Sequence, residues 1–447
     1  MAAARLIDKR PHNIPGRLKV AELSFDVPLD YNNPNAARIR IFARSVRRLT
    51  KPVEPETGEK QLPWLVYLQG GPGMSCRPPQ EYAWIAPVLD RGYQILFLDQ
   101  RGTGLSTPIT AGTLARQGDA VKQAEYLRLF RADSIVQDCE AIRKCLTADF
   151  PEEKKKWSTL GQSFGGFCSV TYLSKFPEGL KEVFTCGGLP PLVNGPDPVY
   201  TAIYEKVAER NEVYYAKFPE DTERVKRILA YLKKEAPVLP SGDVLIPARF
   251  QQMGIFFGMG GGLDLVHDIV LRSISDLDNF GFLTRPTLFN IESAGGFENN
   301  VIYAILHEPL YCQGTASNWS ADRLLSNDPR FRLDSDQVFF TGEMIYKNMF
   351  ESYGELKAME EPAQILASYD DWPALYDEEQ LAKNEVPVYS ATYVEDMYVN
   401  FKFATDTASK IKNCKQFITN TMYHDGIRAR ADEVMRQLFT LRDDSID

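Results

Sequence analysis

A serine between two glycines is the residue of this chain best suited to chemistry. Ser163 stands at the centre of the pattern G-x-S-x-G, with Gly161 two residues before it and Gly165 two residues after it. In a nucleophile elbow, this composition places the serine at the tip of a sharp turn between a strand and a helix, with its hydroxyl exposed. Glycines on both sides remove the Cβ atoms that would collide in so tight a turn. The pattern predicts a serine nucleophile, although an ordinary loop in an inactive protein can also carry it.

A serine nucleophile needs a base that takes its proton and an acid that fixes the tautomer of that base. Of the four histidines in the chain, only His424 follows the last predicted strand. The acid is expected after the preceding strand, where we choose Asp396 over its neighbour Glu395. In extended backbone, successive side chains point to opposite faces, so only one of these two carboxylates can reach the histidine. The predicted catalytic residues are therefore Ser163, Asp396 and His424, whereas Asp425 is expected to be a surface or turn residue.

The oxyanion that forms during acyl transfer needs two backbone N–H groups aimed at it. One is expected from Phe164, the residue after the nucleophile. The other is expected from Gly70-Gly-Pro-Gly73, which directly follows an apolar, strand-like run. Pro72 has no N–H to donate, so Gly71 is our prediction. An ordinary glycine and proline turn is the alternative interpretation of this segment.

Alternating strand and helix patterns must position these residues. Apolar runs that end in glycine-rich breaks are typical of a parallel sheet, in which ligands gather at the carboxyl ends of the strands. Helical periodicity then dominates an insertion of about 180 residues after Pro190-Pro191. We predict core segments at residues 1–192 and 381–447 with a helical cap at 193–380. The eight predicted strands are residues 20–27, 37–46, 64–68, 94–98, the run leading into Gly161, 183–186, 386–392 and 414–419.

The composition of the chain disfavours several kinds of binding partner and indicates a cellular compartment. The net charge is −9, and no block of basic residues is large enough to indicate nucleic-acid binding. No stretch approaches the roughly 18 apolar residues of a membrane span. Seven scattered cysteines without a C-x-x-C pair indicate reduced thiols in a cytoplasmic protein and disfavour a structural zinc site. The glycine-rich segments 102–106 and 258–262 lack the remaining residues of a dinucleotide fingerprint and of a P-loop, respectively. The sequence is compatible with a homo-oligomer.

Three motifs together resemble those of the prolyl aminopeptidases (proline iminopeptidases) of the α/β-hydrolase superfamily. The resemblance spans most of the chain and is closest to the longer members with a large helical cap. With the strand pattern, it predicts an α/β-hydrolase fold with an eight-stranded, mostly parallel sheet and a helical cap inserted between strands six and seven. The motifs are GGPGMS at 70–75, DQRGTGLS at 99–106 and GQSFGG at 161–166, and segments 306–311, 340–345 and 423–426 are also similar.

The resemblance implies removal of an N-terminal proline from peptides by serine acyl transfer, without a metal or other cofactor. It gives Ser163, His424 and Asp396 the roles of nucleophile, base and acid. One departure is Gln69, where many relatives have histidine. This difference leaves the backbone donors of the following loop intact. An esterase or amidase with another acyl specificity and a non-catalytic scaffold are the alternatives, and the serine in the elbow disfavours an epoxide hydrolase with an aspartate nucleophile.

An exopeptidase must recognise a charged amino terminus, and buried carboxylates can do so through charge-assisted hydrogen bonds. In relatives, acidic residues of the cap play this part, and here the candidates are Glu308 and Glu343, with Glu292 third. A solvated surface glutamate is the alternative interpretation for each. The proline ring also needs an apolar pocket, to which we expect contributions from residues that we do not rank: Tyr311, Cys312 and Phe340.

Overall fold

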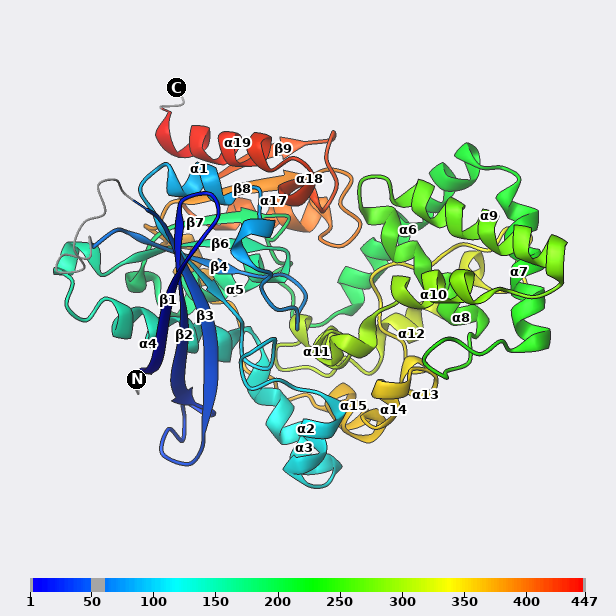
Figure 1. Ribbon diagram of the computed structural model, residues 1–447, viewed down its shortest axis with the longest axis horizontal. Helices are drawn as coiled ribbons and strands as arrows, with labels where there is room; N and C mark the ends of the chain where they lie inside the picture. The colour runs from blue at the N-terminus through cyan, green and yellow to red at the C-terminus, as the bar shows by residue number, and fades with distance from the viewer. Residues whose placement is uncertain (1–2, 50–60, 445–447) are drawn as a thin grey trace.

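A twisted sheet flanked by helices lies beside a second group of helices (Figure 1). The computed structural model describes residues 3–49 and 61–444. Within them the sheet has nine strands in the order β1-β2-β3-β5-β4-β6-β7-β8-β9. The pairs β1–β2, β2–β3 and β3–β5 are antiparallel, and the other pairs are parallel. The strands are β1 Arg5–Ile14, β2 Leu18–Pro28, β3 Arg38–Arg48, β4 Trp64–Leu68, β5 Gln94–Leu98, β6 Trp157–Gln162, β7 Leu180–Cys186, β8 Val388–Tyr393 and β9 Cys414–Thr419.

The predicted number of strands was wrong by one, because β1 was missed. This strand forms the edge of the sheet, and most of its residues are exposed. Its sequence, RLIDKRPHNI, lacks the apolar alternation of a half-buried strand and contains Pro11. A polar, proline-containing strand is tolerated at an edge, where hydrogen bonds to only one neighbour are required. The helical insertion consequently lies between β7 and β8.

The central strands are apolar on both faces because helices cover both. Along β4, Leu65 and Tyr67 belong to one buried cluster, which includes residues of α1 (Ile85–Leu89) and α19 (Ala431–Asp443). Val66 and Leu68 belong to the other cluster, which includes residues of α4 (Ala132–Leu146) and α5 (Phe164–Lys175). The parallel register aligns the strand ends, with Leu68 of β4 paired to Gly161 of β6. The loops that carry the predicted chemistry therefore leave the sheet at the same edge.

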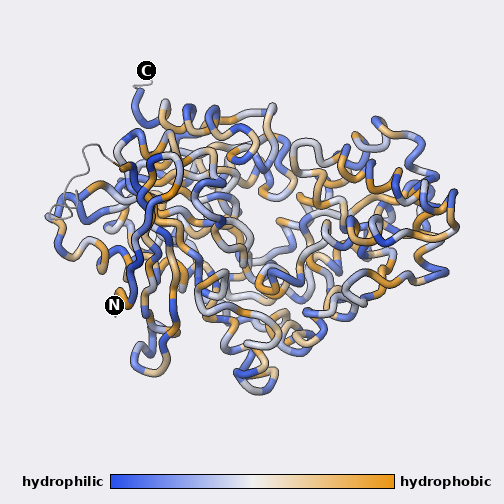
Figure 2. The backbone as a smooth tube through the Cα atoms, in the orientation of Figure 1, coloured by the Kyte–Doolittle hydropathy of each residue, from blue (hydrophilic) through white to orange (hydrophobic). Residues whose placement is uncertain are grey.

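Helices dominate the chain between β7 and β8, and Figure 1 places α6 to α10 in a group to one side of the sheet. Hydrophobic segments occur in both groups in Figure 2. No helix in the described part of the chain is long and apolar enough to cross a membrane. The helices of this region are α6 Asp197–Lys217, α7 Asp221–Glu235, α8 Pro247–Gln251, α9 Gly262–Phe280, α10 Arg285–Ala294, α11 Val301–Leu306, α12 Ser320–Leu325, α13 Met349–Ser352, α14 Gly354–Lys357, α15 Glu360–Ser368 and α16 Glu378–Ala382, with 3-10 turns at Gln252–Gly258 (η7) and Glu308–Tyr311 (η9).

The remaining helices lie outside this insertion. Two of them, α2 and α3, follow β5, and α15 of the helical region packs against α3. Another, α17, connects β8 to β9, and α18 precedes α19 after the last strand. Their bounds are α2 Ala111–Leu114, α3 Ala120–Leu127, α17 Phe401–Lys410 and α18 Gly426–Ala429.

Candidate active site

Ser163 lies in a tight, strained turn between β6 and α5. Its backbone has φ +54° and ψ −125°, a conformation that residues with a side chain rarely adopt. A Cβ atom at Gly161 would lie 2.3 Å from the carbonyl oxygen of Gly165, and one at Gly165 would lie 1.8 Å from that of Leu68. Only glycine fits at these two positions, so the pattern seen in the sequence is a steric requirement of the turn.

Asp396 and His424 form an ion pair within hydrogen-bonding distance. His424 Nδ1 is 2.8 Å from Asp396 Oδ2, and both side chains are buried. Asp396 follows β8 and His424 follows β9. The other carboxylate oxygen, Oδ1, accepts hydrogen bonds of 2.9 Å from the backbone N–H groups of Tyr398 and Val399. These bonds fix the carboxylate, which in turn orients the imidazole.

The two neighbouring carboxylates have other partners. Glu395 forms a 2.8 Å ion pair with Lys206 of α6, in the helical region. Asp425 accepts a 3.1 Å hydrogen bond from the backbone N–H of Gly260. Of Glu395 and Asp396, Asp396 is therefore the one that lies against His424. This agrees with the expectation that only one of two successive side chains can reach the histidine.

A pair of glycines after β7 brings the serine turn and the acid–base pair together. A Cβ atom at Gly187 would lie 3.1 Å from His424 Nδ1 and 3.2 Å from Asp396 Oδ2. At the next residue, Gly188, a Cβ atom would lie 2.8 Å from the carbonyl oxygen of Ser163. The two glycines thus pack between the predicted nucleophile and its predicted base and acid. The sequence marked them only as the end of a strand.

The environment of His424 favours the charged form of the ring. Burial by itself lowers the pKa of His424, but the charge and hydrogen bond of Asp396 and the charge of Glu343 outweigh it, so the net pKa is raised. Arg428 acts in the opposite direction and lowers this pKa. The site therefore stabilises the imidazolium that forms when a histidine accepts a proton from serine.

The predicted oxyanion donors flank the serine. Phe164 is the first residue of α5, and the N–H groups of a first helical turn have no acceptor within the helix. Gly70 lies against the nucleophile, because a Cβ atom there would be 3.0 Å from Ser163 Cβ. Gly71, the residue predicted from the sequence, has φ +124° and faces its own loop. The structure thus brings Gly70 nearer to Ser163 than the prediction assumed.

The loop of Gly70 and Gly71 is held by the segment that follows β5. Asp99 accepts a 2.8 Å hydrogen bond from the backbone N–H of Cys76, and Gln100 Nε2 donates a 3.0 Å bond to the carbonyl of Gln69. The side chain of Gln69 in turn accepts hydrogen bonds from two tyrosine hydroxyls, Tyr67 at 2.9 Å and Tyr82 at 3.3 Å. A glutamine can therefore anchor this loop at the position where the family resemblance led us to expect histidine.

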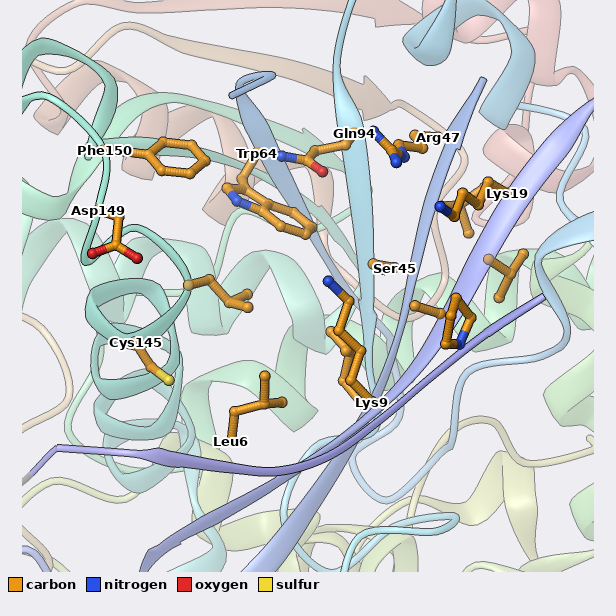
Figure 3. Close-up of a pocket in the computed structure, with 16 residues that line it drawn as sticks. Leu6, Lys9, Lys19, Ser45, Arg47, Trp64, Gln94, Cys145, Asp149 and Phe150 are labelled. Carbon is orange, nitrogen blue, oxygen red and sulfur yellow. The ribbon is translucent and has the colours of Figure 1, made fainter. Parts of the chain in front are cut away.

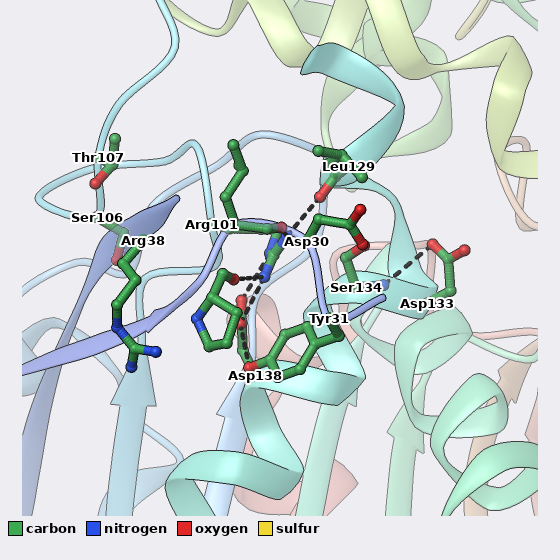
Figure 4. Close-up of polar contacts among 12 residues, drawn as sticks. Asp30, Tyr31, Arg38, Arg101, Ser106, Thr107, Leu129, Asp133, Ser134 and Asp138 are labelled. Atoms are coloured by element: carbon green, nitrogen blue, oxygen red, sulfur yellow. Dashed lines mark hydrogen bonds and ion pairs between the residues drawn. The ribbon is translucent and has the colours of Figure 1, made fainter. Parts of the chain in front are cut away.

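Arg101, the third residue of the same DQRG segment, makes a buried set of polar contacts (Figure 4). Its guanidinium is fully buried and makes two 2.7 Å hydrogen bonds to Asp138 of α4. It also donates to the backbone carbonyls of Leu29 and Leu129. Tyr31 adds a 2.8 Å hydrogen bond to the same aspartate. The DQRG motif thus combines loop support from its first two residues with a buried ion pair from its third.

Glu343 lies close to the acid–base pair. Burial raises the pKa of Glu343 to about 7, while the charge of His424 and a hydrogen bond from the Tyr303 hydroxyl oppose the rise. The charge of Asp396 raises the same pKa. These three titratable groups therefore share one electrostatic environment. Glu343 is thus a buried carboxylate of the helical region that lies near the predicted acid and base.

The other two candidate carboxylates have different surroundings. Glu308 is buried, burial raises its pKa, and its Oε1 accepts a 2.9 Å hydrogen bond from the backbone N–H of Ala321. Glu292 lies on α10 and accepts a 3.0 Å bond from the backbone N–H of Ser241 within the helical region. Glu308 is thus buried, as a carboxylate that binds an amino terminus is expected to be. The hydrogen bond of Glu292 links two segments within the helical region.

The candidates for the apolar pocket have different surroundings. Tyr311 lies between the sheet and the helical region, with its ring centroid 6.2 Å from Phe167 of α5 and 6.0 Å from Tyr200 of α6. Burial raises the pKa of Tyr311, and the charges of Glu343 and Asp396 raise it further, so this ring is near the site. Cys312 is buried, and its carbonyl accepts a 2.7 Å hydrogen bond from Arg131.

Phe340 belongs to the aromatic core of the helical region. Its ring centroid is 5.7 Å from Tyr214 and 5.5 Å from Phe257, and the residue is buried. These neighbours come from α6 and η7. The structure therefore shows Phe340 packed within the helical region, and its contribution to a proline pocket stays a prediction.

Two further residues of the site were missed in the sequence. Tyr303 donates to Glu343, and His307 is buried with its ring centroid 5.1 Å from that of Tyr303. Burial lowers the pKa of His307 to about 4, so the ring is neutral at neutral pH. Tyr303, His307 and Tyr311 recur every four residues, a helical spacing that could have indicated a shared face.

A hollow at the opposite edge of the sheet contains none of the predicted site residues (Figure 3). Its volume is about 620 Å³, and it is lined by Trp64 and Gln94, the first residues of β4 and β5. Cys145 near the end of α4 forms part of another wall. Because the predicted chemistry lies at the carboxyl ends of the parallel strands, this hollow is separate from the candidate active site.

Comparison with known proteins gives the family. The family model of the alpha/beta hydrolase fold matches residues 63–230. A proline iminopeptidase of Aspergillus aculeatus is 51% identical over 449 residues, which cover 100% of this chain and 99% of that protein. The chain belongs to the proline iminopeptidase family. A second member, from Aeromonas sobria, is 41% identical over 424 residues, covering 94% of this chain and 96% of its own.

Membership in this family extends over the sheet and the helical region, since the relatives align along the whole chain. The match to the alpha/beta hydrolase model includes Ser163 but ends before Asp396 and His424. A solved proline iminopeptidase of Mycobacterium smegmatis is similar with a TM-score of 0.43 and 13% identity, over 94% of this chain and 98% of that one. The family assignment rests on the two sequence relatives.

Proposed function

We propose that this protein releases proline from the amino terminus of peptides, with Ser163 as nucleophile, His424 as base and Asp396 as the acid that orients the base. The observation that carries the proposal is the 2.8 Å contact between His424 and Asp396, beside a glycine pair that also packs against Ser163. The names of the two full-length relatives supply the substrate class.

In the proposed reaction, Ser163 Oγ attacks the carbonyl carbon of the N-terminal proline. His424 accepts the hydroxyl proton, and the Phe164 N–H together with an N–H from the Gly70–Gly71 loop stabilises the oxyanion. Collapse of the tetrahedral intermediate breaks the peptide bond, and the imidazolium returns the proton to the departing amine. Water, activated by the same histidine, then attacks the prolyl ester and releases free proline.

The helical region supplies selectivity in this proposal. We assign it to residues 193–380 as a cap on a core formed by 1–192 and 381–447. Glu343 receives the protonated imino group of the substrate, with Glu308 as a second acidic group further from the acid–base pair. Tyr311 contributes an apolar wall for the proline ring. A charge-assisted hydrogen bond in a partly buried site favours substrates with an N-terminal cation over neutral acyl compounds.

The direct test compares chromogenic amides of proline with those of alanine and leucine, and with a simple acetyl ester. The proposal predicts hydrolysis of the prolyl amide at a kcat/KM well above that of the other substrates. N-acetylation of the prolyl amide removes the cation, so that compound should be hydrolysed poorly. Hydrolysis of the acetyl ester without release of proline would contradict the proposal and indicate an esterase of the same fold.

A further inference from the structure

A polar cleft opens beside the loop of Gly70 and Gly71, at the carboxyl end of β4. Its volume is about 430 Å³. One wall consists of the loop itself, from Gln69 to Arg77, and of the following segment up to Trp84. Ile427 and Arg428 also line the cleft, and Asn300 lines it from the helical region. The cleft therefore lies between the two segments that flank the predicted nucleophile and base.

The residues that line the cleft include close sequence neighbours of the candidate active-site residues. Gln69, which lines it, precedes Gly70, whose Cβ position is 3.0 Å from Ser163 Cβ. Arg428 follows His424 by four residues, and its positive charge lowers the pKa of that histidine. The lining of the cleft is thus continuous in sequence with the predicted oxyanion loop on one side and with the predicted base on the other.

Two arginines without ion-pair partners give the cleft a positive charge. Among residues 3–49 and 61–444, neither Arg77 nor Arg428 forms a salt bridge or a side-chain hydrogen bond, and both are exposed. Glu81 is the third charged residue of the lining, so the positive charges outnumber the negative one. The rest of the protein carries a net negative charge, since the whole chain has a charge of −9. A guanidinium binds a carboxylate through two parallel hydrogen bonds, which makes a carboxylate the ligand that these side chains fit best.

The orientation of a bound peptide indicates that this carboxylate is the C-terminal one of the substrate. In the proposed function the imino group of proline points toward Glu343 in the helical region. The rest of the peptide must then leave the scissile bond on another side, along the nucleophile's loops. Consecutive Cα atoms are about 3.8 Å apart, so the terminal carboxylate of a dipeptide or tripeptide lies within one or two such steps of the scissile bond. A cation four residues after the base is suitably placed for it.

We propose that this cleft binds the part of the substrate that follows proline, and that Arg428, assisted by Arg77, receives the C-terminal carboxylate of short peptides. This inference rests on the proposed release of N-terminal proline and adds a preference for peptide length and for a free carboxyl terminus.

The test uses the matched pair Pro-Leu-Gly and Pro-Leu-Gly-amide, which differ only in the terminal carboxylate. For the wild type, we expect kcat/KM to be about tenfold or more higher for the free acid, a difference typical of a hydrogen bond to a charged group. In Arg428→Gln the acid-to-amide ratio should fall toward one, and Arg428→Lys should retain part of it. Arg430→Gln is the matched control, because Arg430 pairs with Glu433 and does not line the cleft, so its ratio should equal that of the wild type. Added salt should reduce the wild-type ratio, since screening weakens exposed charge interactions.

The outcomes separate this inference from the proposed function. A wild-type ratio near one, or a ratio unchanged in both Arg428→Gln and Arg77→Gln, overturns the role of the cleft while proline is still released. A failure to release proline from both peptides and from a neutral prolyl amide rejects the proposed function, and this inference with it. Using the ratio cancels any effect of the Arg428 charge on His424, because both peptides share the same catalytic residues.

Discussion

Replacing Glu343 by glutamine should stabilise the protein at alkaline pH and weaken its activity. Burial raises the pKa of this carboxyl from an ordinary value of 4.5 to about 7. A difference of this size corresponds to about 3 kcal/mol between the charged and neutral forms. Glutamine keeps the shape of the protonated side chain, and its carbonyl oxygen can still accept the hydrogen bond of Tyr303.

The stability effect depends on pH in a defined direction. Between pH 4.5 and 7 the folded protein keeps the proton of Glu343 while the unfolded chain loses it. The wild type therefore loses stability as pH rises through this range, and the full loss of about 3 kcal/mol is present above pH 8. Glu343→Gln lacks this loss. Relative to the wild type, its free energy of unfolding should rise between pH 4.5 and 8 and then stay constant.

Activity should change in the opposite sense. A hydrogen bond to a charged group contributes about 1.5–3 kcal/mol, so kcat/KM for a prolyl amide should fall by about 10- to 100-fold at pH 8. The gap between wild type and variant should narrow below pH 7, where Glu343 is neutral in the wild type as well. Glu355→Gln, at an exposed glutamate of α14, is the matched control and should change neither quantity.

Urea unfolding at pH 5 and pH 8.5 and the rate of proline release over the same range provide the two measurements. The wild type and both variants are compared under identical conditions, so the contributions of other titrating groups cancel in the differences between them. A difference in unfolding free energy that does not vary with pH would refute the burial argument. An unchanged kcat/KM at pH 8 would refute the role of Glu343 in holding the imino group.

Three further predictions follow from the geometry of the site and its support. Asp396→Asn should lower kcat for prolyl amides by about 10⁴, whereas Glu395→Gln, which breaks a partly exposed ion pair, should change it little; steady-state kinetics with the prolyl amide distinguish the two. Gly165→Ala should prevent folding of the serine turn and abolish activity, while Gly112→Ala, whose Cβ has its nearest neighbour at 3.9 Å, should leave the thermal unfolding temperature almost unchanged. Asp138→Asn leaves a fully buried guanidinium without its counter-charge and should cost about 3–5 kcal/mol in urea unfolding, an outcome that an unaltered midpoint would contradict.

The local patterns that the sequence showed clearly are those with one steric or topological solution. The turn at Ser163 needs glycine at 161 and 165, and buried strands such as β4 and β5 carry apolar residues on both faces, so both features could be recognised without coordinates. Alternation along extended backbone required a choice between Asp396 and Glu395 but did not dictate which. The ion pair of Glu395 with Lys206 of α6 shows why, because it depends on how the helical region lies on the sheet.

Features that depend on tertiary packing could not be predicted in the same way. The edge strand β1 is polar and contains proline, so its pairing with β2 leaves no apolar period in the sequence. Both Glu308 and Glu343 are candidates in the sequence, and only packing brings Glu343 close to His424. Phe340 was expected to contribute to the proline pocket, and nothing in the sequence indicated that its ring packs against Tyr214 of α6 and Phe257 of η7. The position of a side chain within a helical cap is set by contacts between segments far apart in the chain.

The central claim is that Ser163, activated by His424 and Asp396, attacks the carbonyl of an N-terminal proline. The most direct measurement is the rate of free proline release from Pro-Leu-Gly by the wild type and by Ser163→Ala at equal concentration. The account predicts release by the wild type and a loss on the order of 10⁶ in the variant, the magnitude seen when a serine nucleophile is removed. Release of proline at a comparable rate by Ser163→Ala would contradict it.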